Sequence, residues 1–275
     1  MATPLSSYVL THNSARYLAR VLAQLKRVAD EVIVADSGST DQTVAIARAA
    51  GCRVETRPFT DFGEQRNWAL SLCTHDYVLF PDSDEIMSDA LVETLLAMKE
   101  RGLDRECYMI RRETFICGQM VHTFYPSISP DYQIRLLRRS VASYAPTHRV
   151  HELAVGLRDG ALIDATIQHL AVADLGELER KLQLYTDLAA ADIADRGGAP
   201  WLLTLQALTR GPFAFMKWYG PRGGWRDGRL GLTLGHFAYR YTYLKYLKAS
   251  RLVRARHAVA LSPKAADGVS AARDS

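Results

Sequence analysis

The stretch Asp76-Tyr-Val-Leu-Phe-Pro-Asp-Ser-Asp-Glu85 joins a short apolar run to a cluster of acids. Residues 77–80 are apolar and end at a proline, which is typical of a buried strand in a parallel sheet. Asp82, Asp84 and Glu85 follow at once. Ligands of open α/β sheets bind just beyond the carboxyl ends of the strands, so these acids are well placed for a ligand.

The spacing of the acids predicts a metal site. Asp82 and Asp84 place two hard oxygen ligands within reach of one Mg²⁺ or Mn²⁺ ion, and such an ion usually also holds substrate phosphates. The alternative is an exposed acidic turn in which Ser83 or Ser88 caps the next helix. The position after a buried strand, together with the rest of the chain, favours the metal site.

The first hundred residues alternate between strand and helix patterns. Each apolar run is followed by a stretch with helical spacing and a capping residue, such as Asn13 or Ser14 for the first helix and Thr40 for the second. The predicted strands span 5–10, 31–35, 52–56 and 77–80, and the predicted helices span 14–28, 40–51, 62–72 and 88–101. With right-handed crossovers, this alternation predicts an α/β fold with a parallel, doubly wound sheet.

After Gly102 the alternation of strand and helix patterns ends. Strand patterns follow without intervening helices, which indicates antiparallel additions to the sheet, and a helix and a basic helical segment come last. The predicted strands are 106–116, 132–138 and 161–169, and the predicted helices are 175–195, 200–209 and 229–257, with Gly/Pro breaks at 211–212 and 220–224. Residues 258–275 are small and polar, which predicts disorder.

The composition of the 275 residues fits one large domain, alone or with an extension. The amino terminus has no basic region followed by a long apolar run, so we expect no signal peptide. No stretch approaches ~18 uninterrupted apolar residues, so no membrane-spanning helix is expected. The four cysteines lack Cys-x-x-Cys spacing, which favours free thiols in a reducing compartment.

Positive charge is concentrated near the carboxyl end. Residues 201–257 hold eleven Lys and Arg and one Asp, a net charge of +10, whereas the whole chain carries +4. Such a region favours an anionic partner, either a membrane or a nucleic acid. No nucleic-acid motif accompanies the charge, so we expect no nucleic-acid partner.

Tyrosines interleave with the basic residues of this segment at Tyr239, Tyr241, Tyr243 and Tyr246. This composition suits a membrane interface. The alternative is a helix that packs its aromatic stripe on the core and leaves a solvated basic face. The charge bias along the whole segment favours the membrane.

Two residues outside the acidic stretch are candidates for ligand contact. Asp36 ends a predicted strand at the same edge of the sheet, where it can accept from a uracil N3–H or a ribose hydroxyl; plain turn chemistry in Asp-Ser-Gly-Ser explains it equally well. Arg66 precedes the acidic strand and can face a diphosphate. Its alternative is a solvated helix arginine.

A second polar cluster, Thr147-His-Arg-Val-His-Glu152, offers a general base. Glu152 can deprotonate an acceptor hydroxyl, and His151 can bind the metal or serve as the base instead. On a strand these neighbours point to opposite faces, so only one of them faces the acidic turn unless the chain bends. A polar strand end is the alternative. The histidines at 12, 75, 122, 169 and 236 form no recognisable ligand spacing.

Together these motifs resemble family 2 glycosyltransferases of the GT-A fold. The match covers roughly the first 90 residues, in family order: Tyr-Val-Leu-Thr-His-Asn13, Val-Ile-Val-Ala-Asp-Ser-Gly-Ser-Thr-Asp41, Gln-Arg-Asn67 and the acidic stretch. Val-His-Glu152 and Arg226-Asp-Gly228, followed by a basic helical tail, resemble a subgroup that includes bacterial lipopolysaccharide-core β-glucosyltransferases.

The resemblance implies inverting transfer of one sugar, glucose as the best guess, from a UDP-sugar to a lipid-linked saccharide such as the lipopolysaccharide core, with a divalent cation (Mg²⁺ or Mn²⁺). Single transfer is implied because the Gln-x-x-Arg-Trp motif and spanning helices of processive members are absent. The implied location is the cytoplasm, peripherally on the inner membrane. The implied site residues are Thr11, Asn13, Asp36, Arg66, Asp82 and Ser83 for the donor, Asp84 and Asp82 for the metal, and Glu152, or His151, as base.

The same resemblance divides the chain into a nucleotide-sugar-binding half (1–103), an acceptor-side half (104–198), a basic amphipathic extension (199–257) and a tail (258–275). Two rival functions stay open. Sugar-phosphate nucleotidyltransferases share such a sheet but open with a glycine-rich loop, and residues 11–14 contain no glycine. The second rival function is that of a catalytically inactive module that binds a nucleotide or docks on a membrane.

Overall fold

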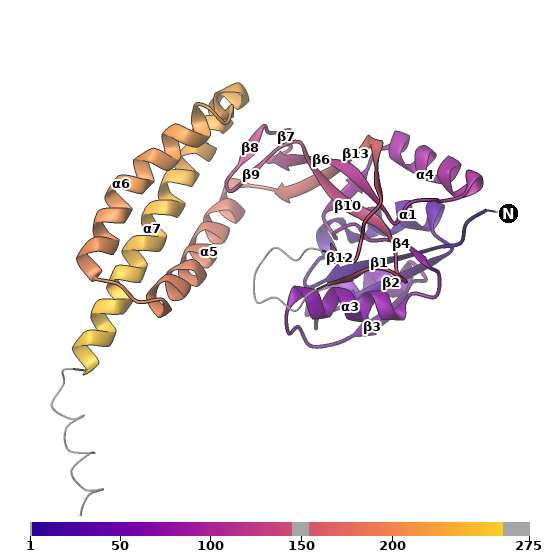
Figure 1. Ribbon diagram of the computed structural model, residues 1–275, viewed down its shortest axis with the longest axis horizontal. Helices are drawn as coiled ribbons and strands as arrows, with labels where there is room; N and C mark the ends of the chain where they lie inside the picture. The colour runs from indigo at the N-terminus through magenta and orange to yellow at the C-terminus, as the bar shows by residue number, and fades with distance from the viewer. Residues whose placement is uncertain (1, 145–153, 261–275) are drawn as a thin grey trace, which may run out of the picture. The chain divides into compact units, whose positions relative to one another are not determined.

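The computed structural model describes residues 2–144 and 154–260, which form two compact units (Figure 1). The sheet unit contains the chain up to Gly118 and Pro130–Ala171, and the helical unit contains Gln119–Ser129 and the chain from Val172 onward. The helix predicted at 175–195 therefore groups with the carboxyl-terminal helices. The division into donor and acceptor halves at residue 103 stays a prediction.

Four parallel strands and four helices form the first part of the sheet unit, in the alternation that the sequence predicts. The strands are β1 (Leu5–Thr11), β2 (Glu31–Asp36), β3 (Arg53–Thr56) and β4 (Tyr77–Leu79), and the helices are α1 (Ala15–Val28), α2 (Thr43–Ala49), α3 (Phe62–Leu72) and α4 (Asp89–Arg101). β1 pairs in parallel with β2 and β4, and β2 pairs in parallel with β3.

Antiparallel strands complete the sheet, as expected for the residues after Gly102, and the short strand β5, which the sequence did not predict, joins them. They are β5 (Glu85–Met87), β6 (Cys107–Ile116), β10 (Asp131–Arg138) and β13 (Gly160–Val172), and the sheet order is β3-β2-β1-β4-β10-β6-β13-β5. β10 runs antiparallel to β4 and β6, and β13 runs antiparallel to β5. The remaining short strands are β7 (Gln119–Met120), β8 (Thr123–Phe124), β9 (Ser127–Ile128), β11 (Ser143–Tyr144) and β12 (Ala154–Val155).

Alternate residues of the central strands pack into two separate hydrophobic clusters, one on each face of the sheet. Val9 and Leu79 belong to the cluster that holds the apolar faces of α1 and α4. Tyr8 and Val78 belong to the cluster that holds Ala69 and Leu70 of α3. Because neighbouring side chains of a strand point to opposite faces, helices cover the sheet on both sides, which is the doubly wound arrangement.

Two predicted helix boundaries are wrong. The second helix begins at Thr43 rather than at Thr40, because the Asp41 carboxylate accepts hydrogen bonds from Thr43 N (2.9 Å) and Thr43 Oγ1 (2.5 Å) in the turn before it. The predicted break at Gly211-Pro212 is absent, and α6 (Pro200–Tyr219) runs through Pro212. An interior proline costs about 3 kcal/mol, so tertiary packing must offset that cost.

That packing comes from the helical unit. It consists of α5 (Leu175–Asp195), α6, the short 3₁₀ helix η1 (Gly224–Asp227) and α7 (Gly228–Ala260), and Figure 1 shows α7 running beside both α6 and α5. A Cβ added at Gly211 would lie 3.2 Å from the Tyr239 ring, so only glycine lets α6 and α7 approach this closely without a shift of the ring.

The tyrosines of α7 are half-buried and contact neighbours within the helical unit, which agrees with the alternative interpretation of the sequence. Tyr239 stacks on Tyr243 with ring centroids 5.7 Å apart, and Tyr241 lies 5.0 Å from Tyr125. Tyr246 Oη accepts a hydrogen bond from Arg210 Nη1 at 2.6 Å. Side chains other than these tyrosines therefore make up the exposed apolar surface of this unit.

Two sequence expectations concern the whole chain. The four cysteines all lie within the described residues and form no disulfide. Among the helices of residues 2–144 and 154–260, none has both the length and the apolar character needed to cross a bilayer.

Candidate active site

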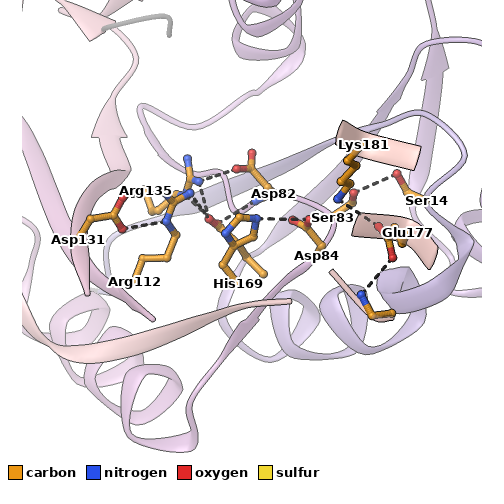
Figure 2. Close-up of polar contacts among 12 residues, drawn as sticks. Ser14, Asp82, Ser83, Asp84, Arg112, Asp131, Arg135, His169, Glu177 and Lys181 are labelled. Carbon is orange, nitrogen blue, oxygen red and sulfur yellow. Dashed lines mark hydrogen bonds and ion pairs between the residues drawn. The ribbon is translucent and has the colours of Figure 1, made fainter. Parts of the chain in front are cut away.

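The acidic turn after β4 is fixed by backbone hydrogen bonds on both sides. Glu85 N donates to Asp82 O at 3.0 Å, and Leu170 N of β13 donates to Asp84 O at 2.9 Å. Ser83 Oγ lies 2.9 Å from Ser14 Oγ, at the start of α1. The turn is therefore held against both the β1–α1 loop and β13, and its side chains have defined directions (Figure 2).

Asp82 lies between two arginines. Arg66 donates from Nη2 to Asp82 Oδ1 at 3.2 Å, and Arg135 donates from Nη2 to Asp82 Oδ2 at 2.5 Å. Burial alone would raise the pKa of Asp82, but the charges of Arg135 and Arg66 outweigh it and hold this pKa well below its usual range. Asp82 is therefore ionised, and each of its oxygens already has a cationic partner.

Arg66 is buried, so the solvated-arginine alternative is wrong. Its guanidinium lies over the rings of Phe80 (5.7 Å) and Tyr144 (5.9 Å), which fixes its plane beside the acidic turn.

Glu85 belongs to the interior rather than to a ligand surface. Its side chain is fully buried and accepts from Arg135 Nε (2.7 Å) and Nη2 (2.5 Å) and from Arg112 Nη1 (3.4 Å). Arg112 also donates from Nη2 to Asp131 at 2.6 Å. Figure 2 shows most of this series, which we call the ion-pair chain: Arg66, Asp82, Arg135, Glu85, Arg112 and Asp131. Its three acids and three arginines balance in charge.

Sequence analysis missed Arg135 and Arg112. Both lie on strands that follow the alternating first hundred residues, β10 and β6, and neither belongs to a motif. A signal did exist for Arg135, which interrupts the otherwise apolar run Ile134-Arg-Leu-Leu137 in a strand. Arginine is rarely buried unless it is paired, so a charge within a buried strand indicates a buried acid nearby.

Asp84 points away from the ion-pair chain toward His169 on β13, and its Oδ2 lies 3.5 Å from His169 Nε2 (Figure 2). Burial would lower the pKa of His169, but the hydrogen bond and charge of Asp84 outweigh burial and raise it. His169 Nδ1 is buried and has no hydrogen-bond partner among the described residues. The sequence had left this histidine unassigned.

Within the described part of the chain, no group of three or more His, Cys, Asp or Glu side chains could hold a metal. Asp84 and His169 nevertheless fit a divalent cation as two ligands, one oxygen and one nitrogen. Mg²⁺ is commonly held by one or two protein carboxylates, with water and substrate phosphates in the remaining positions. The Asp84 carboxylate suits that mode of binding, and His169 can join it as a ligand only in its neutral form.

The ends of β1 and β2 carry the other predicted donor residues. Asp36 accepts four hydrogen bonds, from Thr11 Oγ1 (2.8 Å), Gly38 N (2.9 Å), Ser39 N (2.8 Å) and Ser39 Oγ (2.5 Å). A carboxylate has about four lone-pair sites, so these bonds fill them. A base or ribose contact by Asp36 therefore requires the exchange of one of these partners.

Asn13 joins the same two strand ends. Its backbone is left-handed, with φ of 52°, and its Oδ1 accepts from Thr40 N at 2.9 Å and from Asp41 N at 3.3 Å. Asparagine tolerates this conformation better than most residues. Asn13 therefore fixes the loop after β1 against the loop after β2.

The hydrogen bonds of Asp36 predict a dependence of stability on pH. Burial raises the pKa of Asp36, but the bonds from Ser39, Thr11 and Gly38 outweigh it and lower the pKa. Stability from a lowered pKa is present above the unfolded value, about 4, and is lost as the pH falls through the folded value. Asp36→Asn should therefore destabilise the fold at pH 7, with a gap from wild type that narrows below about pH 4.

Urea midpoints at pH 7 and pH 3 measure this gap. Asp164→Asn, at an exposed position of β13, is the matched control and should show little change at either pH. A gap for Asp36→Asn that is equal at both pH values would contradict the prediction.

The structure thus gathers Arg66, Asp82, Ser83 and Asp84 at the acidic turn, with Thr11, Asn13 and Asp36 at the ends of β1 and β2. The Ser83–Ser14 hydrogen bond joins the two groups. His151 and Glu152 lie outside the described residues, so their predicted role as base stays a prediction.

Comparison with known proteins identifies relatives of this chain. The sequence profile of glycosyl transferase family 2 matches residues 6–150. An uncharacterized glycosyltransferase of Rickettsia typhi is 29% identical over 203 residues, 70% of this chain and 69% of that protein. The lipopolysaccharide core biosynthesis glycosyltransferase LpsC of Rhizobium meliloti is 26% identical over 279 residues, 97% of this chain and 98% of LpsC.

Solved structures give a weaker likeness. Glucosyl-3-phosphoglycerate synthase of Mycobacterium tuberculosis, crystallised with Mg²⁺ and uridine diphosphate, has a TM-score of 0.44 and is 21% identical. The similarity covers 64% of this chain and 74% of that chain.

Proposed function

This chain belongs to glycosyl transferase family 2 and has the GT-A fold, and we propose that it transfers a single sugar, with inversion, from a UDP-sugar to a hydroxyl of a lipid-linked glycan. The observation that carries the proposal is the acidic turn at the carboxyl ends of the strands, with Asp84 directed at His169. Similarity to LpsC along nearly the whole chain supports a lipopolysaccharide-core acceptor. Glucose is our best candidate for the sugar.

Asp84 and His169 would hold the divalent cation, Mg²⁺ or Mn²⁺. When bound, the cation would neutralise the charge that grows on the leaving diphosphate. Asp82 remains a candidate metal ligand, but its two arginine partners favour a contact with the ribose of the donor. Arg66 would hold Asp82 ionised and in place beside the diphosphate.

Thr11, Asn13, Asp36 and Ser83 would shape the rest of the donor site. Thr11 Oγ1 donates to Asp36, so it sets the direction of that carboxylate. Asn13 fixes the two loops between which the nucleoside would lie. Ser83 is held at the turn by Ser14 and would face the diphosphate.

The base in this proposal is Glu152, with His151 as the alternative. Removal of a positioned general base typically costs about 10²–10⁴-fold in rate, so Glu152→Ala should lose that much turnover and keep donor binding. His151→Ala should change turnover by less than about tenfold, because loss of a neighbour disturbs only the position of the base.

Steady-state release of UDP measures the turnover of each variant, and Glu93→Ala on the exposed surface of α4 is the control. A large loss in His151→Ala with a small loss in Glu152→Ala would assign the base to His151. Full turnover in both variants would remove this segment from the chemistry.

The proposed location is the cytoplasmic face of the inner membrane, with the chain attached peripherally. A lipid-linked acceptor presents its glycan at that surface. The net charge of +10 over residues 201–257 favours the anionic lipids there.

The proposal is tested by incubating the purified full chain with UDP-glucose and other UDP-sugars, with and without Mn²⁺. Binding should raise stability by about 2.7 kcal/mol at a ligand concentration of 100 times Kd. Release of UDP in the presence of Mn²⁺ supports a glycosyltransferase. Release of pyrophosphate from a sugar phosphate and UTP would instead support the nucleotidyltransferase alternative, and binding without any turnover would support the inactive module.

A further inference from the structure

The outward face of α6 carries an unusual row of exposed apolar side chains. They recur at intervals of three and four residues, which places them within an arc of about 80° on the helix. This row, which we call the α6 stripe, consists of Trp201, Leu205, Leu208, Pro212 and Met216. Trp201 is 66% exposed, Leu208 56% and Met216 60%.

The opposite face of the same helix explains why the stripe faces outward. Leu203, Ala207, Ala214 and Trp218 are buried in the helical unit. The packing of α6 is therefore complete without the stripe. Soluble monomers rarely expose a large contiguous apolar patch, and such patches often mark a surface for a partner or a membrane.

The charge around the stripe identifies the partner. α6 contains no acid, and Arg210 and Lys217 are exposed on the same helix. Arg222, Arg226 and Arg229 continue the exposed positive charge just beyond it, next to the 57% exposed Trp225.

Asp227, the single acid of residues 201–257, does not neutralise the exposed positive charge. Asp227 is buried, and its carboxylate accepts from His122 N at 2.9 Å and lies 2.6 Å from His122 Nδ1. The negative charge is thus directed inward. The exposed surface of α6 presents apolar and basic side chains with the neutral Thr209 and no acid, a combination that binds the headgroup region of anionic membranes.

We propose that the α6 stripe docks this chain on an anionic lipid bilayer. Its apolar side chains enter the headgroup boundary, and the flanking arginines and lysine contact lipid phosphates. This deepens the proposed function, which places the acceptor in a membrane, by naming the surface that meets it. That surface is the outer face of α6 and not the tyrosine-rich stretch of α7, whose half-buried tyrosines contact neighbours within the helical unit.

Other occupants fit the stripe less well. A second copy of the chain would bring two sets of exposed arginines and lysine together, and α6 itself contains no acid to balance them. The last fifteen residues offer only Leu261 and Val269 as branched apolar side chains, too few to cover five positions.

The test is flotation of the full chain with phosphatidylcholine vesicles, with or without phosphatidylglycerol. The test variant is Leu205→Glu/Leu208→Glu, and the matched control is Leu184→Glu/Leu188→Glu on α5, where the leucines are 56% and 58% exposed. Wild type should bind the anionic vesicles, and the α6 variant should lose at least about tenfold in partitioning, since it places charge in the apolar contact. The α5 control should partition as wild type does.

A second variant tests the basic flank. Lys217→Glu/Arg222→Glu should weaken binding to anionic vesicles, and added salt should weaken wild-type binding in the same way, because salt screens exposed charges. Equal partitioning of all variants, or equal binding of wild type to neutral vesicles, would overturn the proposal. A wild-type dimer that dissociates in the α6 variant would also overturn the proposal, since the stripe would then be a self-association surface.

Donor binding is measured on the same proteins as the thermal shift with UDP and Mn²⁺. The stripe variants should keep this shift, because they do not alter the acidic turn. A chain that binds UDP but not vesicles refutes only the docking surface. A chain that binds vesicles but not UDP refutes the glycosyltransferase proposal and leaves the docking surface standing.

Discussion

Asp84→Asn is expected to lower sugar transfer by about 10²–10³-fold, because cation-assisted charge stabilisation is worth several kcal/mol and each 1.36 kcal/mol is tenfold in rate. The substitution keeps the size of the side chain, so the hydrogen bond from Leu170 N to Asp84 O should survive. Steady-state release of UDP measures the loss. The thermal shift that UDP gives with Mn²⁺ should also fall toward the shift without Mn²⁺.

The same measurements distinguish the ligand pair from its surroundings. His169→Ala should weaken the Mn²⁺ dependence of UDP binding, whereas the exposed Asp164→Asn on the same strand should not. Wild-type turnover and an unchanged Mn²⁺ dependence in Asp84→Asn would show that the acidic turn holds no cation.

Arg135→Leu is expected to destabilise the fold by about 3–5 kcal/mol, because it leaves the buried Glu85 carboxylate without its main partner. Arg135 makes two hydrogen bonds to Glu85 and one to Asp82, and its side chain is only 5% exposed. Urea unfolding of wild type and variant measures the difference. Such a loss approaches the whole stability of many domains.

The chain supplies a control on the same strand. Arg138 pairs with Asp76 at 3.2 Å, but both side chains are about 40% exposed. Surface pairs contribute roughly 0–1 kcal/mol, so Arg138→Leu should have a small effect.

The double variant Glu85→Leu/Arg135→Leu should be more stable than Arg135→Leu alone. It removes the unpaired Glu85 carboxylate together with Arg135. The ion pairs Asp82–Arg66 and Asp131–Arg112 remain. A double variant less stable than the single one would mean that packing, rather than the buried charge, causes the loss.

Most of the first hundred residues were predictable because their elements carry their own signals, whereas the short strand β5 and the start of α2 were not. Apolar runs such as 32–35 indicate buried strands directly, and Ser88 caps α4 as predicted, with its Oγ accepting from Leu91 N. The break predicted at Gly211-Pro212 failed because local propensity opposed tertiary packing. Close contact with Tyr239 makes the glycine a packing residue, and the helix continues through the proline.

The site was predictable only in its local part. Asp82 and Asp84 stand in one motif, so the sequence places them together at the end of a strand. Their partners come from distant strands: Arg135 is 53 residues from Asp82, and His169 lies on β13. The spacing of residues in the sequence does not predict such pairing, because the sheet topology alone brings these strands together.

The pairing of β5 with β13 also bears on how the protein emerges during translation. The acidic turn and the whole family match lie before residue 151, yet β5 pairs through Ile86 and Met87 with residues 167–168 of β13. A nascent chain on the ribosome therefore carries β5 without its neighbour until residues 167–168, about eighty residues later in the chain, have left the exit tunnel. A fragment cut at residue 150 would keep all the recognisable motifs but leave this edge open, and it should precipitate where a fragment reaching Val172 can fold.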